Sequence, residues 1–240
     1  MRTWLERIPL LSGLETEHFR KLDVPVHRRL YPKNTVIFYE GEPREAVFFV
    51  LGGLVKTTKA DPAGKEQTIS LLQSGEMFPH IGLFDDAPYP ATAKTILDTE
   101  LAIVAIDAFR RLLTRHPETA ALVIGHMERK IQELQHRLQN MSSDVQRRFI
   151  ALLLKLADEF GNEDNGRIVL PIPLTHQEWA SLLGTTRETI NRIVNQLKKE
   201  RLLSTDKRYI ILFHRDRLHE IMQADGRRNY NDNLSHSEKK

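Results

Sequence analysis

The sequence contains no cysteine among its 240 residues. This absence excludes disulfide bonds, cysteine-ligated zinc or iron–sulfur sites and thiolate catalysis, and it is typical of the reducing cytoplasm. A long apolar run is also lacking: the most apolar stretch, residues 150–157, has about a third of the length of a membrane span and contains Lys155. Residues 1–7 are charged and precede no apolar segment of the secretory type. We therefore expect a cytoplasmic protein with no membrane partner.

A large charge of either sign is lacking too, because the formal net charge is only +3. Basic and acidic side chains are equally numerous in residues 1–142, so the whole excess follows that point. Residues 175–217 hold nine Lys and Arg against five Asp and Glu. Such an excess is either an ordinary solvated surface or a basic patch for an anionic partner such as nucleic acid. Only a motif in the same region can decide between the two interpretations.

Short strands separated by turn residues are predicted for the region of residues 24–107. The segments are rich in β-branched and aromatic side chains, and Gly, Pro, Asp and Ser separate them. The expected strands are residues 35–39, 46–51, 54–57, 67–72 and 100–104. Six or more short strands at this spacing favour a small antiparallel barrel or roll. A helix over about residues 2–22 is expected to precede it.

A long helix is predicted from about Pro117 to Met141. Its apolar residues recur in alternating steps of three and four, which is a heptad seam: Ile124, Met127, Ile131, Leu134, Leu138, Met141 and Val145. This seam either packs on the chain's own roll or forms a two-stranded coiled coil with a second copy. The residues between are polar, and a core-facing helix normally has a wider apolar face. We therefore expect a homodimer through this helix.

The remainder of the chain alternates helices with short strands. Residues 142–144 break the long helix, and Asp144 can cap the next one. The expected elements are a helix at 145–160, a turn at 161–166, an edge strand at 167–172, two helices, a β pair at 202–213 and a disordered polar tail at 226–240.

Two helix starts lie within the segment of residues 175–192. Thr175 with Glu178, and Thr185 with Glu188, have the spacing of capping boxes. Two helices that start so close together must be joined by a tight turn.

Small residues suit that turn: Ala180 lets two helices cross closely, and Gly184 permits the reversal of the chain. Helical spacing places one set inward: Trp179, Leu182, Leu183, Ile190, Ile193, Val194 and Leu197. It leaves a polar set outward on the second helix: Thr186, Arg187, Glu188, Asn191, Arg192, Asn195 and Lys198. Such side chains read base edges and phosphates in a DNA major groove.

Residues 1–225 resemble the Crp/Fnr family of transcription regulators, which includes the cAMP receptor protein. The most specific part is the motif Gly184-x-x-Arg187-Glu188-Thr189-x-x-Arg192. Three glycines match the β-roll of the family, a fold that channels and kinases share: Gly41, Gly53 and Gly75. The resemblance implies an α+β protein with a cyclic-nucleotide-binding-like β-roll, a long coiled-coil dimer helix and a C-terminal winged helix-turn-helix.

The resemblance also implies roles in DNA binding. Arg187 and Arg192 would each contact a guanine, and Glu188 would accept a hydrogen bond from a cytosine amino group. The alternative for Glu188 is that it only closes its capping box. Contacts to the DNA backbone are expected from Thr175, Gln177, Thr185, Thr186, Asn191 and Lys198. The operator would be an inverted repeat with GTGA-like half-sites.

The candidate effector pocket departs from the family pattern. Cyclic-nucleotide binders of the family have Gly-Glu before Gly-Leu-Phe and Arg-Ser after it. This chain has Pro79-His80 before Gly82-Leu83-Phe84, and Tyr89-Pro90 after it. A bound phosphate needs backbone amides and a cation, and proline has no amide proton. We therefore expect that cAMP does not bind. No cofactor is expected, and either another small molecule or no ligand is left for the pocket. The residues assigned to the pocket are Gly75, Glu76, His80 and Tyr89.

His80 lies where carbon-monoxide-sensing relatives bind haem, so a haem or other small-ligand sensor with secondary DNA binding is the alternative function. Oxygen-labile clusters of the Fnr type need the cysteines that this chain lacks. An enzyme is not expected, because no Ser/His/Asp order, metal cluster or phosphate loop stands out.

Four parts are expected: a β-roll sensor domain (residues 1–116), a dimerisation helix (117–143), a winged helix-turn-helix domain (144–217), and a terminal helix with tail (218–240). The expected function is that of a homodimeric, sequence-specific regulator that binds double-stranded DNA and meets RNA polymerase at promoters.

Overall fold

The computed structural model describes residues 25–61, 64, 66–139, 144–206 and 209–223. The chain divides into two compact units between Gln139 and Asn140. The expected helix of residues 2–22 and the expected tail of residues 226–240 lie outside the described residues.

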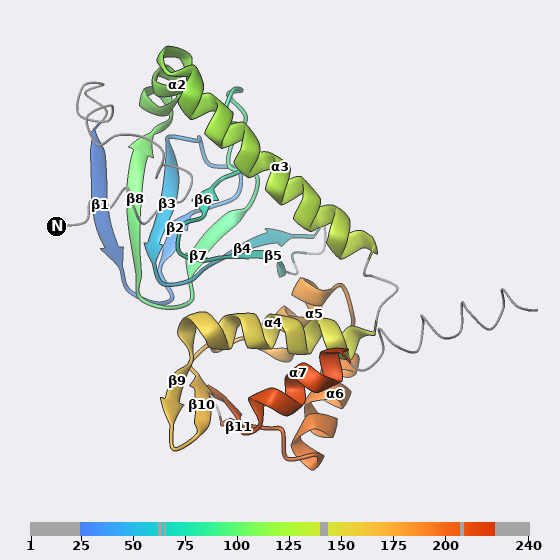
Figure 1. Cartoon of the computed structure of the whole chain (residues 1–240). Coiled ribbons are helices and arrows are strands. Elements are labelled where there is room, and N and C mark those ends of the chain that lie inside the picture. The colour runs from blue at the N-terminus through green and yellow to red at the C-terminus, as the bar shows by residue number, and fades with distance from the viewer. Residues whose placement is uncertain (1–24, 62–63, 65, 140–143, 207–208, 224–240) are drawn as a thin grey trace, which may run out of the picture. The chain divides into compact units, whose positions relative to one another are not determined.

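The first unit contains two four-stranded antiparallel sheets, shown in blue to green in Figure 1. The strand orders are β1-β8-β3-β6 and β2-β7-β4-β5. The strands are β1 (Val26–Tyr31), β2 (Val36–Phe38), β3 (Ala46–Gly52), β4 (Val55–Ala60), β5 (Glu66–Leu72), β6 (Met77–Phe78), β7 (Thr92–Thr95) and β8 (Thr99–Ala105). The predicted β-roll is confirmed, and β1, β6 and β7 are strands that the sequence pattern did not reveal.

Two apolar cores lie on the two faces of the sheet that contains β3. Phe48 and Val50 belong to the core shared with the second sheet. Val47 and Phe49 belong to the core that includes residues of two helices, α2 (Ile106–Arg115) and α3 (Pro117–Gln139). Because both faces of β3 are covered, its first six residues are all buried and all apolar.

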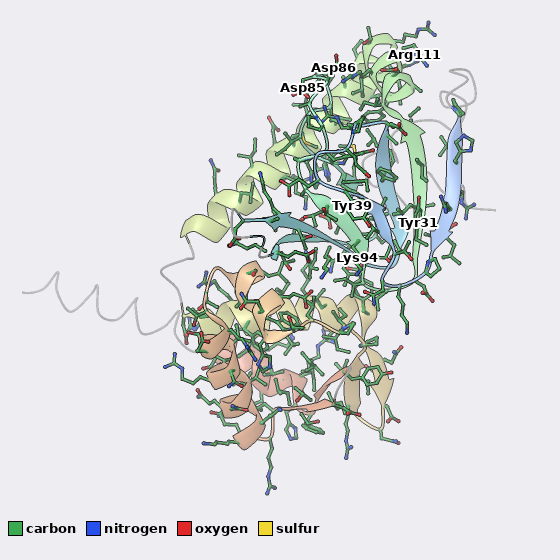
Figure 2. The ribbon with its side chains drawn as sticks, turned by 180° about the vertical axis from the view of Figure 1, so that it is seen from behind. Tyr31, Tyr39, Asp85, Asp86, Lys94 and Arg111 are labelled. Atoms are coloured by element: carbon green, nitrogen blue, oxygen red, sulfur yellow. The ribbon has the colours of Figure 1, made fainter. Side chains whose placement is uncertain are left out.

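The segment that connects β6 to β7 is held in place by two arginines. Arg44 donates to the carbonyl oxygens of Ile81 (3.1 Å) and Asp85 (2.7 Å) and pairs with the Asp85 carboxylate (2.6 Å). Arg110 of α2 donates to the Leu83 carbonyl (2.9 Å) and pairs with Asp86 (3.1 Å). Figure 2 shows Asp85 and Asp86 in the same part of the first unit as Arg111, which belongs to α2. The connection is therefore a fixed wall of the roll.

Helix α3 presents several seam residues to the solvent. Ile124, Ile131 and Leu134 are 60%, 55% and 56% exposed. Met127 is half-buried and packs against the core of the first unit. Only the backbone of Leu138 is described, and Met141 lies outside the described residues. Within the described part of α3, the seam thus leaves three apolar side chains uncovered.

The second unit begins with α4 (Val145–Phe160), capped by Asp144, whose side chain accepts from the Gln146 N–H at 3.0 Å. A four-stranded antiparallel sheet of order β11-β12-β10-β9 follows. After α4, the second unit contains β9 (Asn162–Asp164), β10 (Arg167–Leu170), α5 (His176–Leu183), α6 (Arg187–Lys199), β11 (Leu203–Asp206), β12 (Tyr209–Leu212) and α7 (Arg215–Gln223). The segment expected as a plain turn at 161–166 therefore includes strand β9, and the last helix begins at Arg215.

Candidate nucleic-acid interface

Helix α5 starts and ends as its sequence predicts. Thr175 accepts from the Glu178 N–H at 3.2 Å, and the Glu178 carboxylate accepts from the Thr175 N–H at 2.7 Å. These two bonds are the predicted capping box. Gly184 ends the helix in the left-handed conformation, at φ 60° and ψ 46°, which a glycine adopts without the penalty of a side chain. The Thr185 N–H then donates to the Ala180 carbonyl at 2.9 Å and closes the turn.

The second predicted capping box, Thr185 with Glu188, is wrong. The N-cap of α6 is Thr186, whose side chain accepts from the Thr189 N–H at 3.2 Å. The register moves by one residue because the backbone of Thr185 is used to close the preceding turn. Glu188 is therefore not the third residue after the N-cap, as a capping box requires. The alternative that Glu188 only closes a capping box is wrong.

The buried side of the two helices fixes their relative position. Ala180 is fully buried where α5 crosses its neighbours, and Trp179 packs edge-on against Phe149 of α4 with ring centroids 5.3 Å apart. The predicted inward residues are buried, except that Leu182 is only half-buried: Trp179, Leu183, Ile190, Ile193, Val194 and Leu197. Helix α6 is thus held by an apolar face that leaves its opposite face free.

That opposite face is polar over its whole length. All seven residues predicted outward are exposed: Thr186, Arg187, Glu188, Asn191, Arg192, Asn195 and Lys198. In the described chain, Arg187, Glu188 and Arg192 make no ion pair with one another. Three charged side chains in the first two turns of α6 are therefore available to an external partner.

Of the residues expected to contact the DNA backbone, some lie at the starts of α5 and α6 and others farther along α6. Thr175 and Thr186 are the two N-caps, and Gln177 is half-buried on the first turn of α5. Asn191 accepts a side-chain bond from Asn195 at 3.3 Å. Lys198 lies in the last turn of α6, away from the caps. Thr185 lies in the turn between the two helices. All these residues thus belong to one helix-turn-helix motif, and their roles stay predictions.

The sequence interpretation missed His176, the first residue of α5. Its pKa lies below the usual 6.5, first because burial disfavours the imidazolium and then because Lys198 and Arg187 repel a further positive charge. A half-buried histidine under the field of two α6 cations belongs to the same basic surface. The sequence feature that could have drawn attention to His176 is its position directly after the N-cap Thr175, because backbone N–H groups at a helix start attract anions.

The first unit contains a cavity lined by residues of β4, β5, the segment after β6 and α3. Of the four residues assigned to the effector pocket, only His80 lines this cavity. Tyr89 is buried and stacks on Phe38 with ring centroids 3.7 Å apart. Glu76 accepts from the Gln73 N–H at 2.7 Å and pairs with Lys130 of α3. Gly75 donates its N–H to the Val50 carbonyl at 2.8 Å. Gly75, Glu76 and Tyr89 thus make contacts within the first unit, and none of the three lines this cavity.

Within the described residues, no helix is long and apolar enough to cross a membrane, and no three His, Asp or Glu side chains are grouped to hold a metal ion. A β-roll followed by a capped helix-turn-helix beside a small antiparallel sheet is the architecture typical of a class of DNA-binding transcription regulators.

The comparisons with known proteins agree with that class. The family model described as "Cyclic nucleotide-binding domain" matches residues 28–116, and the "Crp-like helix-turn-helix domain" matches residues 147–221. The chain is 32% identical over 193 residues to the Cyclic AMP receptor protein of Thermus thermophilus, covering 80% of this chain and 86% of that protein. It is 29% identical over 185 residues to the Global nitrogen regulator of Nostoc sp., covering 75% and 82%.

A solved CRP/FNR-family transcriptional regulator from Thermus thermophilus has the same fold, with a TM-score of 0.68 at 24% identity over 82% of this chain and 98% of that one. The chain belongs to the Crp/Fnr family. It is therefore a DNA-binding transcription regulator and not an enzyme.

Proposed function

We propose that the protein binds an inverted repeat with GTGA-like half-sites as a homodimer and regulates transcription at promoters in the cytoplasm, where it meets RNA polymerase. Arg187 contacts the outer guanine of each half-site. Arg192 and Glu188 share the inner G·C pair, one at the guanine and the other at the cytosine amine. The observation that carries this proposal is the exposure of all three side chains, without mutual ion pairs, at the capped start of α6.

Selection of binding sites from random DNA tests the assignment of the base contacts. We expect a symmetric motif with G·C pairs, since a bidentate arginine–guanine pair contributes roughly 1–3 kcal/mol of discrimination. Arg187→Ala should then relax the preference at one base pair per half-site by about tenfold. Arg217→Ala, an exposed arginine of α7, is the matched control and should keep the native motif. A recovered motif without symmetric G·C pairs contradicts the roles of the three residues.

The homodimer is supported by the uncovered apolar side chains of α3. Ile124, Ile131 and Leu134 lie three or seven positions apart, which is the spacing of a coiled-coil seam. Large apolar side chains that repeat along one helix and stay exposed favour a second helix as their partner. A two-fold dimer also accounts for an operator with inverted symmetry.

The expectation that cAMP does not bind stays part of this proposal. Pro79 and Pro90 line the cavity and offer no N–H to a phosphate. Among the relatives, one is named for cyclic AMP and another for nitrogen regulation. Titration calorimetry with cAMP is the direct test, and micromolar binding would contradict our interpretation of the cavity.

The haem alternative rests on His80. Its ring stacks on His126 of α3 with centroids 5.7 Å apart. The visible absorption spectrum of the purified protein, with and without added haem, tests it. A Soret band would favour the alternative.

A further inference from the structure

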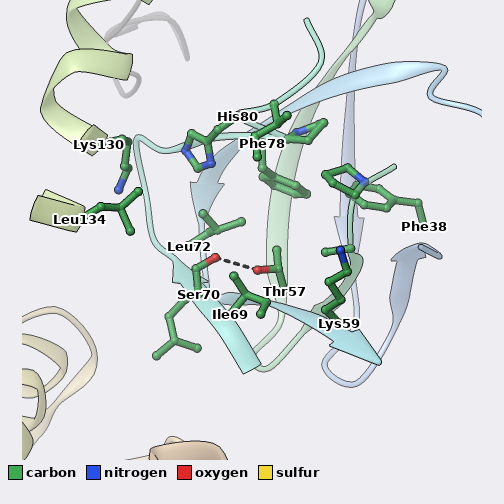
Figure 3. A pocket seen from close by; sticks show the side chains of 15 residues that line it. Phe38, Thr57, Lys59, Ile69, Ser70, Leu72, Phe78, His80, Lys130 and Leu134 are labelled. Atoms are coloured by element: carbon green, nitrogen blue, oxygen red, sulfur yellow. Dashed lines mark hydrogen bonds between the residues drawn. The ribbon is translucent and has the colours of Figure 1, made fainter. Parts of the chain in front are cut away.

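The first unit contains a cavity of about 400 Å³ between β4, β5, the segment that follows β6, and α3. This volume lies within the range of small-molecule sites in proteins, roughly 300–1,000 Å³. Figure 3 shows His80 and Lys130 on one side of the cavity, Phe38 and Lys59 on the other, and Ser70 and Thr57 between them.

The walls of the cavity are mainly apolar. They are formed largely by aromatic and branched aliphatic side chains: Phe38, Ile69, Leu72, Phe78, Ile81 and Leu134. The wall at Ile81 is prearranged, because Arg44 fixes the Ile81 carbonyl. A ligand that fills such a space must have an apolar body, since burial of a nucleotide's many polar groups against these walls would leave them unpaired.

Two hydroxyl groups form a polar spot within the apolar walls. Thr57 Oγ1 and Ser70 Oγ lie 2.7 Å apart and share one hydrogen bond. Two hydroxyls carry two protons, and their mutual bond uses only one of them. The second proton can be donated to an acceptor atom of a ligand.

The charged side chains that line the cavity are all cationic. Lys59 and Lys130 line it, whereas their acidic partners, Glu40 and Glu76, do not. Lys59 lies 3.9 Å from Glu40, a distance at which the ammonium can still take a further partner. A negative charge on the ligand is therefore favoured beside the two hydroxyls, which lie between the two lysines.

We propose that this cavity binds an apolar monocarboxylate, with its acyl or aryl body against the aromatic walls and its carboxylate on the Thr57–Ser70 hydroxyls and Lys59. The inference deepens the proposed function, on which its regulatory meaning rests, because Lys130 and Leu134 belong to the helix that carries the proposed dimer seam. Leu134 belongs both to the cavity wall and to the proposed dimer seam, so a ligand that packs against Leu134 contacts the seam directly beside Ile131.

Calorimetric titration of the full-length protein tests the proposal with 2-naphthoate and decanoate as probes, and with 2-naphthamide and cAMP for comparison. We expect micromolar binding of at least one carboxylate. We expect the amide to bind about tenfold more weakly, because a hydrogen bond to a charged acceptor is stronger than one to a neutral acceptor. Equal binding of 2-naphthoate and 2-naphthamide, no binding of any probe, or tighter binding of cAMP would each overturn the proposal.

Variants locate the site. Thr57→Val with Ser70→Ala removes both hydroxyls at nearly constant shape and should weaken carboxylate binding about tenfold. Lys59→Met should weaken it about threefold, and Lys33→Met, an exposed lysine outside the cavity, should not change it. If the double variant fails to fold, Lys59→Met and the amide comparison still decide. DNA binding of the unliganded protein is measured separately, so that its failure counts against the proposed function and not against the ligand.

Discussion

The helix-turn-helix and the cavity of the β-roll build their sites in opposite ways. The proposed DNA-facing surface comes from one continuous stretch, residues 175–198, whose helical period separates buried from exposed side chains. The cavity takes its lining from β2, β4, β5, β6, the connection after β6, and α3. A site that is local in sequence can be assigned from periodicity alone, whereas a site assembled from distant segments needs the strand pairing first.

The largest effect should come from disrupting the proposed dimer seam of α3. This seam would hold two protomers together, each with its own helix-turn-helix and its own cavity. Ile131→Asp with Leu134→Asp places four carboxylates in an apolar dimer contact, so we expect monomers. DNA affinity should fall by at least about a hundredfold, because two linked half-site contacts become independent. Gln132→Asp with Gln135→Asp introduces the same charges on exposed neighbours and should leave the dimer intact. Sedimentation that shows the seam variant still dimeric would contradict the seam.

The corrected cap of α6 sharpens the description of the local site. Thr186→Ala removes the side chain that accepts the Thr189 N–H and should lower the free energy of unfolding of the second unit by about 1 kcal/mol. Thr185→Ala is the matched control and should have a much smaller effect, since the described bond of Thr185 in the turn is made by its backbone. Chemical denaturation followed by circular dichroism measures both. The reverse order of the two losses would restore the cap predicted from the sequence.

A substitution at Gln177 tests whether contacts to the DNA backbone and contacts to the bases are made by different residues of the helix-turn-helix. Gln177→Ala should weaken binding by about threefold on every sequence alike, because a phosphate contact carries no base information. Affinities for the selected operator and for a half-site variant give the ratio of interest. A changed ratio would mean that Gln177 reads a base.

The smallest effect concerns pH. The pKa of His176 is lowered in the folded, DNA-free protein. As pH falls through about 6.5, the unfolded chain therefore binds a proton at His176 more readily than the folded chain does. Protonation of His176 thus lowers the free energy of unfolding at acidic pH. DNA phosphates would offset the repulsion from Lys198 and Arg187 and favour the imidazolium. Affinity at pH 6.0 relative to pH 7.5 should thus be about twofold higher for the native protein than for His176→Asn. His219→Asn, on α7, serves as control, and identical pH profiles for native and His176→Asn would remove the histidine from the interface.

Much of the fold follows from local pattern. The five expected strands appear within three residues of their predicted bounds, and α4 spans the predicted residues 145–160. Strands β1 and β6 escaped prediction for different reasons. The β1 sequence Val-His-Arg-Arg-Leu-Tyr has four exposed positions and little apolar alternation, and β6 has only two residues. Their strand conformation comes from pairing with β8 and β3, which a single sequence does not display.

The pocket assignment shows the same limit. Gly75, Glu76 and Tyr89 stand close to His80 in sequence, yet the Tyr89 hydroxyl is turned inward, where it donates to the Ala46 carbonyl at 3.3 Å. The hydroxyls of Thr57 and Ser70 belong to two different strands, and only the β4–β5 register makes them neighbours. No spacing rule along the chain connects them.

The two arginines that hold the connection between β6 and β7 recognise mostly backbone carbonyls, those of Ile81, Leu83 and Asp85. Such anchoring depends little on which side chains the connection carries. Ile81, which lines the cavity, is 69% exposed, so we expect its exchange to leave the path of the chain unchanged. The wall of the cavity can therefore change its chemical preference by substitution while its scaffold is inherited intact. Substitutions in this wall can therefore change which ligand the cavity binds while the backbone keeps its conformation.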